Sequence, residues 1–490
     1  MIDTMLLLRH QLAQRPAGQT VRRRLAEVVR AAVIDGTLEA GAVLPASRVL
    51  ARELGLGRNT VLHAYEQLTT EGYLTADRQG TVVCHLGPRP GAAPTQASVA
   101  SPPSLPPLAR RALPSTLPPG EDETPLPFLP GIPALDQFPL ERWRRRVAQA
   151  WRVVNSATLA GRDVCGEPVL RAAIAGYLRA SRGVRCEPEQ VVVTSGTQES
   201  LALCAQLLAD PGERVWMEHP GYMGASTAFV SAGLQLVPVP VDSEGLAPTA
   251  ALWRRQPPRL VYTTPSHQYP LGVPLSLPRR LALIEQARRT GSWILEDDYD
   301  SEFCRGVPLA AMQGLAPDAP VVYLGTFSKT LYPALRLAYA VLPEAAVNAV
   351  MPALARRLAP GRVAEQEALA AFIHDGEFTA HLRRMRRLYA ERQAALRQAL
   401  QQAWPMPPAL SPGEGGMHLA LALPPTVDDR EVVRHAQARG LEPRALSTYT
   451  VGGGTPLNGL VLGYANVPAE QVNAYVRTLA WAVRQALRCE

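Results

Sequence analysis

Hydrophobic positions near the start of the chain recur at the spacing of an α-helix. Between residues 19 and 35 the apolar side chains fall on one face, arginine and glutamate cover the other, and Gly36 follows as a stop signal. The apolar positions of this face are Val21, Leu25, Val28, Val29 and Ala32. The pattern predicts one amphipathic helix.

Two shorter helices and a hairpin are predicted next. Ser47 can cap a helix that runs to Leu54, and glycines at 55 and 57 separate it from a second helix, which begins near Asn59 and ends at Gly72. Strand-like segments at 73–76 and 81–84 then flank a turn. Two short helices joined by a glycine-containing turn place the second helix in the major groove of DNA, and the hairpin suits a wing beside it.

The candidate DNA contacts lie at the starts of these two helices, on the first exposed turn of the second, and in the hairpin turn. They are Arg48, Arg58, Asn59, Thr60, His63 and Gly80. Such side chains can meet phosphates or base edges. For each arginine taken alone, a solvated helix face is the alternative interpretation, and for His63 it is a surface or capping role.

Strand-like and helix-like segments alternate through the second part of the chain. The strand-like segments are 190–194, 214–218, 234–241, 259–263, 293–297, 321–324 and 337–341, and amphipathic stretches such as 198–208 and 279–290 lie between several of them. The alternation predicts a large α/β domain whose mostly parallel sheet is covered by helices on both faces. Ligands are expected at the carboxyl ends of its strands.

A proline-rich stretch separates the two regions. Thirteen prolines lie between Pro88 and Pro130, so this stretch can form neither a helix nor a central strand and is expected to be a semi-extended linker. The sequence therefore predicts a multidomain protein. A small α+β winged helix-turn-helix at residues 16–86 precedes a Pro-rich linker at 87–125 and a large α/β domain at 126–490.

Composition narrows the class of protein. The 490 residues are 47% hydrophobic and 19% charged, which suits a large core and excludes a single small binding module. No unbroken apolar run is long enough for a membrane span and no signal peptide is recognisable, so we expect a cytoplasmic protein. Six scattered cysteines without metal-ligand spacing predict free thiols, with no zinc site or disulfide framework. The net charge of +7 permits a polyanionic partner.

One basic residue differs from all the others. Of the 50 lysines and arginines, 49 are arginines and only Lys329 is a lysine. A lysine amine can lose its proton and attack a carbonyl carbon, whereas a guanidinium cannot. We therefore expect a nucleophilic role for Lys329. The alternative is a surface lysine that was retained by chance and has no function.

Polar residues at the ends of other predicted strands suit a phosphorylated aromatic cofactor. Lys329 closes the segment GTFSK, and Thr326 and Arg336 beside it could hold a phosphate. The sequence Ser195-Gly196-Thr197 opens a helix, whose N-terminus also attracts phosphate, although an ordinary helix cap is the alternative.

Aromatic and acidic residues complete this candidate site. Asp297 could keep a pyridine nitrogen protonated, with Glu296 or Asp298 as the alternative carboxylate. Tyr299 could hydrogen-bond a ring hydroxyl, and Tyr222 could stack on a flat ring. Together these features predict pyridoxal 5′-phosphate (PLP), held as a Schiff base on Lys329.

The same motifs resemble known families. The segment from Leu44 to Val83 resembles the winged helix-turn-helix of GntR-type transcription factors, and the motifs PGY, TPSHQYPLG, EDDYDSEF and GTFSK look like a fold-type I aminotransferase. Both in one chain resemble the MocR subfamily of GntR-type regulators. The resemblance implies a Lys329 aldimine, a pyridine contact from Asp297, a ring-hydroxyl contact from Tyr299 and stacking by Tyr222. The phosphate and neighbouring cofactor contacts that it implies are Ser195, Gly196, Thr197, Thr326, Ser328 and Arg336.

The resemblance also implies partners. It predicts a homodimer in which each DNA-binding domain packs on the other subunit, and double-stranded operator DNA with repeated half-sites. Two departures bear on the effector. Tyr269-Pro270 stands where these aminotransferases usually carry Asn-Pro, and Thr448 stands where an amino-acid sensor carries its carboxylate-binding arginine, although Arg444 could substitute. These departures favour sensing of PLP itself, or of an unusual amine or amino acid.

The leading interpretation is therefore a PLP-responsive transcriptional regulator. The alternative is a working aminotransferase with an accessory DNA-binding domain, and a slow half-reaction is compatible with either. A third interpretation is a regulator whose large domain binds no PLP.

Overall fold

The computed structural model describes residues 4–13, 20–77, 80–85, 125–161, 163–304, 310–357, 361–412 and 415–487. The chain divides into two compact units, Met1–Ser104 and Leu105–Glu490, and each is described by itself. The predicted Pro-rich linker lies outside the described residues, except for Pro125 at its end.

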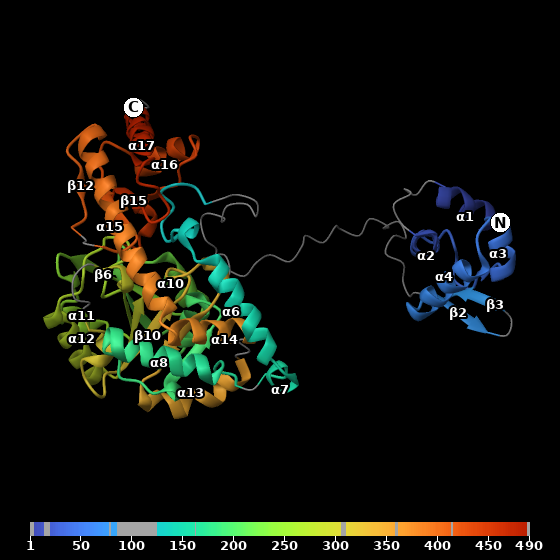
Figure 1. The fold of residues 1–490 in the computed structure, drawn as a ribbon, viewed down its shortest axis with the longest axis horizontal. Helices are drawn as coiled ribbons and strands as arrows, with labels where there is room; N and C mark the ends of the chain where they lie inside the picture. Colours follow the sequence, from blue (N-terminus) through green and yellow to red (C-terminus); the bar gives the residue numbers. More distant parts are fainter. Residues whose placement is uncertain are drawn as a thin grey trace. The chain divides into compact units, whose positions relative to one another are not determined.

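The first unit is a helical bundle with a small sheet (Figure 1). Its helices are α1 (Thr4–Ala13), α2 (Val21–Ile34), α3 (Ser47–Glu53) and α4 (Arg58–Thr70), and its strands are β1 (Val43–Leu44), β2 (Leu74–Asp77) and β3 (Gly80–Val83). The strands form an antiparallel sheet in the order β1-β3-β2, and β2 and β3 are the predicted hairpin. The apolar faces of α2, α3 and α4 meet in one core, to which Leu25, Leu50 and Leu68 contribute fully buried side chains.

One local prediction in this unit is wrong. Ser47 is the first residue of α3 rather than its cap, and the capping position is taken by Ala46, which has no side-chain acceptor. The extended backbone of Ala46 after Pro45 turns the chain into the helix one residue earlier than expected.

The second unit is built on an eight-stranded sheet. In spatial order its strands are β4 (Val191–Thr194), β11 (Ala338–Val341), β10 (Val321–Thr326), β9 (Trp293–Asp298), β8 (Leu260–Thr263), β5 (Arg214–His219), β6 (Gln235–Asp242) and β7 (Gly245–Leu246). Only β11 and the short β7 pair antiparallel to their neighbours among these strands. The prediction of a mostly parallel sheet is therefore confirmed.

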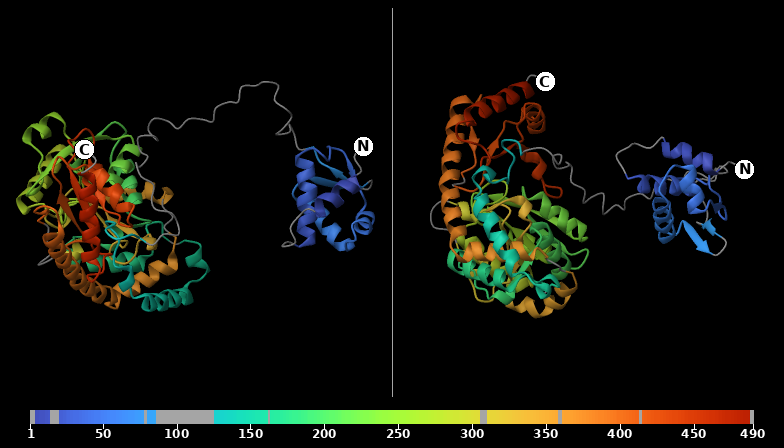
Figure 2. Two further views of the ribbon diagram at one scale, coloured as in Figure 1. Left: turned by 90° about the horizontal axis from the view of Figure 1, so that it is seen from above. Right: turned by 45° about the vertical axis from the view of Figure 1, so that its right-hand side comes forward.

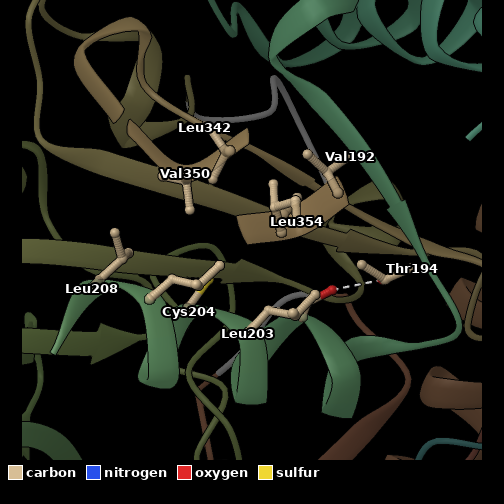
Figure 3. Close-up of a pocket in the computed structure, with 11 residues that line it drawn as sticks. Val192, Thr194, Leu203, Cys204, Leu208, Leu342, Val350 and Leu354 are labelled. Carbon is tan, nitrogen blue, oxygen red and sulfur yellow. Dashed lines mark hydrogen bonds between the residues drawn. The ribbon is translucent and has the colours of Figure 1, made fainter. Parts of the chain in front are cut away.

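Helices cover both faces of this sheet (Figure 2). On one face, apolar side chains of the sheet pack against α9 (Thr197–Leu208), α10 (Met223–Ser231) and α13 (Glu344–Arg357). Figure 3 shows a pocket in this layer, lined by Cys204 and Leu208 of α9, Val192 of β4 and Val350 and Leu354 of α13. Thr194 Oγ1 and Ser200 Oγ share a hydrogen bond of 2.8 Å. The other face packs against α8 (Pro168–Arg182), α12 (Leu277–Thr290) and α14 (Val363–His374).

A smaller antiparallel sheet completes the second unit. Its order is β12 (Ala409–Leu410), β13 (His418–Ala422), β15 (Gly459–Gly463) and β14 (Arg444–Ala445). It packs with α15 (Glu377–Ala403), α16 (Asp429–Gln437) and α17 (Val472–Ala486). The other helices described in this unit are α6 (Leu140–Val153), α7 (Ser156–Leu159) and α11 (Ala250–Arg255), beside short 3-10 turns.

Two further expectations can be compared with the described part of the chain. None of its helices has the length and hydropathy needed to cross a membrane. The five cysteines within it, Cys84, Cys165, Cys186, Cys204 and Cys304, are all free thiols, and Cys489 lies outside it.

A buried ion pair fixes the end of β9 against α8. Arg182 Nε lies 2.8 Å from Asp298 Oδ2, and the two side chains are only 3% and 1% exposed. The Tyr323 hydroxyl of β10 donates a hydrogen bond of 2.6 Å to the same carboxylate oxygen. Because Asp298 is the neighbour of Asp297 in β9, this pair also fixes the part of the strand that carries Asp297.

Replacing Arg182 should therefore destabilise the second unit. Arg182→Ala leaves the Asp298 carboxylate buried without its counter-charge, and we expect a loss of about 3–5 kcal/mol in the free energy of unfolding. The surface pair Arg144–Glu141, with side chains 64% and 78% exposed, provides the control. Arg144→Ala should cost less than about 1 kcal/mol. Urea denaturation followed by circular dichroism measures both, and equal losses would contradict this assignment.

Candidate functional site

A cavity of about 300 Å³ opens where β8, β9 and β10 end and α9 begins. Such a position, at the carboxyl ends of parallel strands, is where open α/β sheets bind ligands. The sequence-predicted residues that line it are Gly196, Thr197, Tyr222, Asp297, Tyr299, Thr326, Ser328, Lys329 and Arg336. Thus the structure brings together residues that lie up to 140 positions apart in the sequence.

Lys329 presents its amine inside this cavity. The connection that follows β10 carries it, and Nζ donates a hydrogen bond of 2.8 Å to the carbonyl oxygen of Gly131. Burial lowers the pKa of the Lys329 amine, while the carboxylates of Asp300 and Asp297 oppose that shift. Burial therefore favours the neutral, nucleophilic form.

Asp297 is the carboxylate that faces the cavity. Its Oδ2 accepts a hydrogen bond of 2.7 Å from Tyr262 of β8, and burial raises the pKa of the group to about 7. Its Oδ1 is buried and has no hydrogen-bond partner among the described residues. A protonated ring nitrogen would satisfy this atom.

The two alternative carboxylates have other partners. Glu296 accepts hydrogen bonds from the backbone N–H groups of Met312 at 2.9 Å and Gln313 at 3.1 Å. Asp298 forms the ion pair with Arg182. Neither lines the cavity in the described structure, so the geometry selects Asp297 among the three.

One end of the cavity is shaped for an anion. Gly196 caps α9 with φ of 139°, and a Cβ built on it would lie 3.5 Å from the guanidinium carbon of Arg336. The open backbone, the start of a helix and a guanidinium thus meet at one point, which suits a phosphate. Thr326 Oγ1 accepts a hydrogen bond of 3.1 Å from the Ser328 N–H beside it.

Ser195 is the one predicted cofactor contact that does not line this cavity. Its backbone N–H donates to Glu199 Oε2 at 2.5 Å, and its side chain is absent from the residues that line the cavity. Its predicted phosphate contact stays a prediction.

Aromatic side chains form the walls. Tyr222 accepts a hydrogen bond of 3.2 Å from Gln198 Nε2 and meets Tyr269 edge to face, with ring centres 5.9 Å apart. Tyr299 donates its hydroxyl to the carbonyl oxygen of His267 at 2.9 Å. The same hydroxyl also lies 3.1 Å from His267 Nδ1.

The structure adds cavity residues that sequence reasoning missed. Tyr262, Gln198, Gly131 and His418 line the cavity. Gln198 could have been predicted from the sequence, because it continues the Ser195-Gly196-Thr197 motif into the helix. The others depend on the pairing of β8 with β9 and on long-range packing, for which the sequence carries no local signal.

A cluster of buried ionisable groups lies against this wall. The potential ligand atoms of His267, Asp300 and His418 lie within 4.8 Å of one another, and His267 Nδ1 is 3.0 Å from Asp300 Oδ2. Burial, followed by the effect of His267, lowers the pKa of His418 well below its usual value. His418 is therefore neutral at physiological pH.

The candidate DNA contacts are distributed over the first unit. Arg48 of α3 and Arg58, Asn59 and His63 of α4 are exposed, whereas Thr60 is half-buried. The His63 Nδ1 atom lies 3.0 Å from Glu66 Oε2. Gly80 begins β3 opposite Asp77. The exposed face of α4 is thus available to a groove, and the individual contacts remain predictions.

Comparisons with known proteins agree with this division. Residues 131–470 match the family described as aminotransferase class I and II, and residues 21–83 match the bacterial regulatory proteins of the gntR family. The probable rhizopine catabolism regulatory protein MocR of Rhizobium meliloti is 38% identical over 95% of this chain and 94% of its own length. The pyridoxine biosynthesis transcriptional regulator PdxR of Corynebacterium glutamicum is 33% identical over 91% of this chain and 92% of its own.

A solved structure covers the second unit. LysN, the α-aminoadipate aminotransferase of Thermus thermophilus, has a TM-score of 0.68 and 30% sequence identity over 74% of this chain and 93% of its own. It was solved in complex with N-(5′-phosphopyridoxyl)-L-leucine.

These matches indicate pyridoxal 5′-phosphate as the cofactor, and the cavity fits it. The buried amine of Lys329 suits the aldehyde, the unpartnered Oδ1 of Asp297 suits the ring nitrogen, and Arg336 beside Gly196 suits the phosphate. When bound, this cofactor supplies an electrophilic aldehyde and an electron-withdrawing ring.

Asp297→Asn should change how stability depends on pH. Because the folded pKa, about 7, is higher than the unfolded value, the wild-type cofactor-free protein loses stability as pH rises from about 4 through 7. The amide does not ionise, so at pH 8 the variant should be more stable by up to about 4 kcal/mol and at pH 4 equally stable.

Thermal unfolding of both cofactor-free proteins across this pH range measures the effect. The exposed Asp318 provides a control, and Asp318→Asn should follow the wild-type profile. Parallel profiles for wild type and Asp297→Asn would show that Asp297 does not carry this penalty.

Proposed function

The chain belongs to the MocR-type GntR regulators, and from that membership we propose that pyridoxal 5′-phosphate is both its cofactor and its signal. The protein is a transcriptional regulator with a GntR-type DNA-binding domain and a PLP-dependent aminotransferase-like domain. The observation that carries the proposal is the placement of the sole lysine in a cavity with Asp297 and Arg336.

Loss of a carboxylate-binding arginine supports PLP over an amino acid as the effector. Thr448 stands at the position expected for that arginine, and its hydroxyl donates to the Ala445 carbonyl at 2.6 Å. A ligand carboxylate there would lack a bidentate partner and several kcal/mol of affinity. The relative named for pyridoxine biosynthesis fits the same interpretation.

Arg444 could bind the acidic group of an amine effector. It lines a neighbouring cavity of about 920 Å³ that shares Gln198 and Tyr222 with the cofactor cavity. Arg430 and Arg434 of α16 line the same space, although Glu442 already pairs with Arg444 at 3.0 Å. An unusual amine is therefore the second effector class that we propose.

GntR-type regulators bind DNA, and proteins with the aminotransferase fold are typically dimers. We propose a homodimer in which each DNA-binding domain packs on the other subunit. Two winged helices at a fixed separation would read an operator with repeated half-sites. A change at Lys329 would alter the population of dimer conformations and hence this separation.

A gel-shift assay on the DNA upstream of the protein's own gene tests this function. Wild type should change its DNA affinity when PLP is added, because the cofactor bonds to Lys329. Lys329→Ala should bind the same DNA without responding to PLP.

Arg58→Ala provides the matched control for the DNA-binding unit. It removes an exposed charge from the start of α4, so DNA binding should weaken both with and without PLP while the visible absorbance of the bound cofactor is retained. Equal PLP responses in wild type and Lys329→Ala would contradict the proposed function.

The competing function is catalysis by an active aminotransferase, favoured by the complete set of Lys329, Asp297 and Arg336 and by the likeness to LysN. We expect slow half-reactions at most and no tight binding of ordinary α-amino acids, because Thr448 cannot grip their carboxylates. Steady-state kinetics and isothermal titration of the PLP-loaded protein measure both. Turnover at about 1–10³ per second without operator binding would establish the enzyme instead.

A further inference from the structure

The chain from Leu126 to Ala134, here named the strap, runs between the small sheet and the cofactor cavity. Asn466 Nδ2 donates to the Leu126 carbonyl at 3.0 Å, and the N–H groups of Glu442 and Gly463 donate to the carbonyls of Pro127 and Phe128 at 2.8 and 2.9 Å. Its first three residues are thus bonded to β15 and to the segments near it.

The strap packs tightly against β15 and the helix α15. Phe128 is fully buried and has a φ of 70°, which is rare for a residue with a side chain. A Cβ on Gly463 would lie 2.3 Å from the Leu129 carbonyl oxygen, so the strap passes directly over the backbone of β15. At the other end, the Ala134 N–H donates to the Tyr389 hydroxyl at 3.0 Å.

The middle of the strap is bonded to the cofactor lysine. Pro130 and Gly131 line the cofactor cavity, and the Gly131 carbonyl accepts the 2.8 Å hydrogen bond from Lys329 Nζ. Gly131 has a φ of 82°, and a Cβ on it would lie 2.7 Å from that nitrogen. The close approach of backbone and amine therefore requires glycine.

We propose that the Gly131 carbonyl detects whether the amine of Lys329 is free, and so couples the cofactor's covalent state to the strap. This inference rests on the proposed bonding of PLP to Lys329. When the carbon–nitrogen double bond forms, the aldehyde carbon–oxygen bond breaks and the oxygen leaves as water with both amine hydrogens. The nitrogen then carries at most one proton, which it would share with the adjacent ring hydroxyl oxygen, instead of the two hydrogens that the free amine offers to Gly131.

An amine effector would reverse this change. As the effector's nitrogen takes over the double bond to the cofactor, its two hydrogens pass to Lys329, and the free amine can donate to Gly131 again. One carbonyl thereby distinguishes lysine-bound cofactor from both an empty site and an effector-bound one.

The strap connects the cofactor cavity with the small sheet and with the predicted linker. The strap follows Pro125 directly, at the end of the stretch predicted to link the large domain to the DNA-binding domain. Through Phe128 it is also paired with β15. Release at Gly131 would therefore act on the small sheet and on the end of the predicted linker.

Hydrogen–deuterium exchange of the full-length protein, read by mass spectrometry on strap peptides, tests the proposal. Three states are compared: cofactor-free, with PLP, and with pyridoxamine 5′-phosphate, which fills the cavity but has no aldehyde to bond Lys329. PLP should speed exchange of the Leu129 and Ala134 amides about threefold to tenfold, as expected for the loss of one net hydrogen bond. Pyridoxamine 5′-phosphate should not.

Three variants separate this role from a merely structural one. Gly131→Ala and Lys329→Ala should show fast strap exchange without cofactor and little further change with PLP. The matched control is Gly291→Ala, at a glycine with φ of 68° and open space around it, which should respond as wild type does.

Two results would overturn the inference while leaving the proposed function intact. One is equal strap exchange with PLP and pyridoxamine 5′-phosphate although absorbance shows the PLP bond to Lys329. The other is a wild-type response in Gly131→Ala. Failure of the absorbance change itself would instead remove the proposed function, and this inference with it.

Discussion

Burial of an amine together with a carboxylic acid is the constraint on which this structure depends. Lys329 and Asp297 are both withdrawn from water, which lowers the pKa of the amine and raises that of the acid. Each group alone would be costly to keep charged, and the cavity tolerates them because each is held by one hydrogen bond, from Tyr262 to Asp297 and from Lys329 to Gly131. A cofactor that bonds to the amine and presents a protonated nitrogen to the carboxylate would relieve this cost.

The end of β9 shows how one short sequence divides three acidic side chains. Glu296 accepts hydrogen bonds from the backbone near Met312, Asp297 faces the cavity, and Asp298 pairs with Arg182. Alternation along the strand separates Asp297 from its neighbours, and the ion pair below fixes the register of the whole segment. The Asp297 carboxylate is thus positioned by Asp298 and Arg182, neither of which lines the cofactor cavity.

Much of this arrangement could be predicted because it is local. The predicted strands and helices of both units follow from alternation and helical spacing, and the residues that line the cofactor cavity lie next to strand ends. The cap of α3 is predicted one residue too late because serine is acceptable on either side of a helix start. The two-residue period of the strand, which places Asp297 and Tyr299 on one face, already favours Asp297 over Glu296 and Asp298.

What could not be predicted depends on pairing across long stretches of chain. Tyr262 meets Asp297 only because β8 and β9 are neighbours in the sheet, and Gly131 meets Lys329 across 198 residues. No periodicity in the sequence encodes such contacts. The Ser195 side chain illustrates the reverse case, since a residue inside a cofactor-like motif lies outside the lining of the cavity.

The antiparallel pairing of β10 with β11 has a consequence for selectivity. The pair Thr326–Ala338 closes the connection that carries both Lys329 and Arg336, so one short piece of backbone sets the spacing between the amine and the guanidinium. This piece of backbone fixes the distance between the group that would bond an aldehyde and the group that would bind a phosphate. A form of the cofactor with a different spacing between aldehyde and phosphate, or without the phosphate, would contact either the Lys329 amine or the Arg336 guanidinium, but not both.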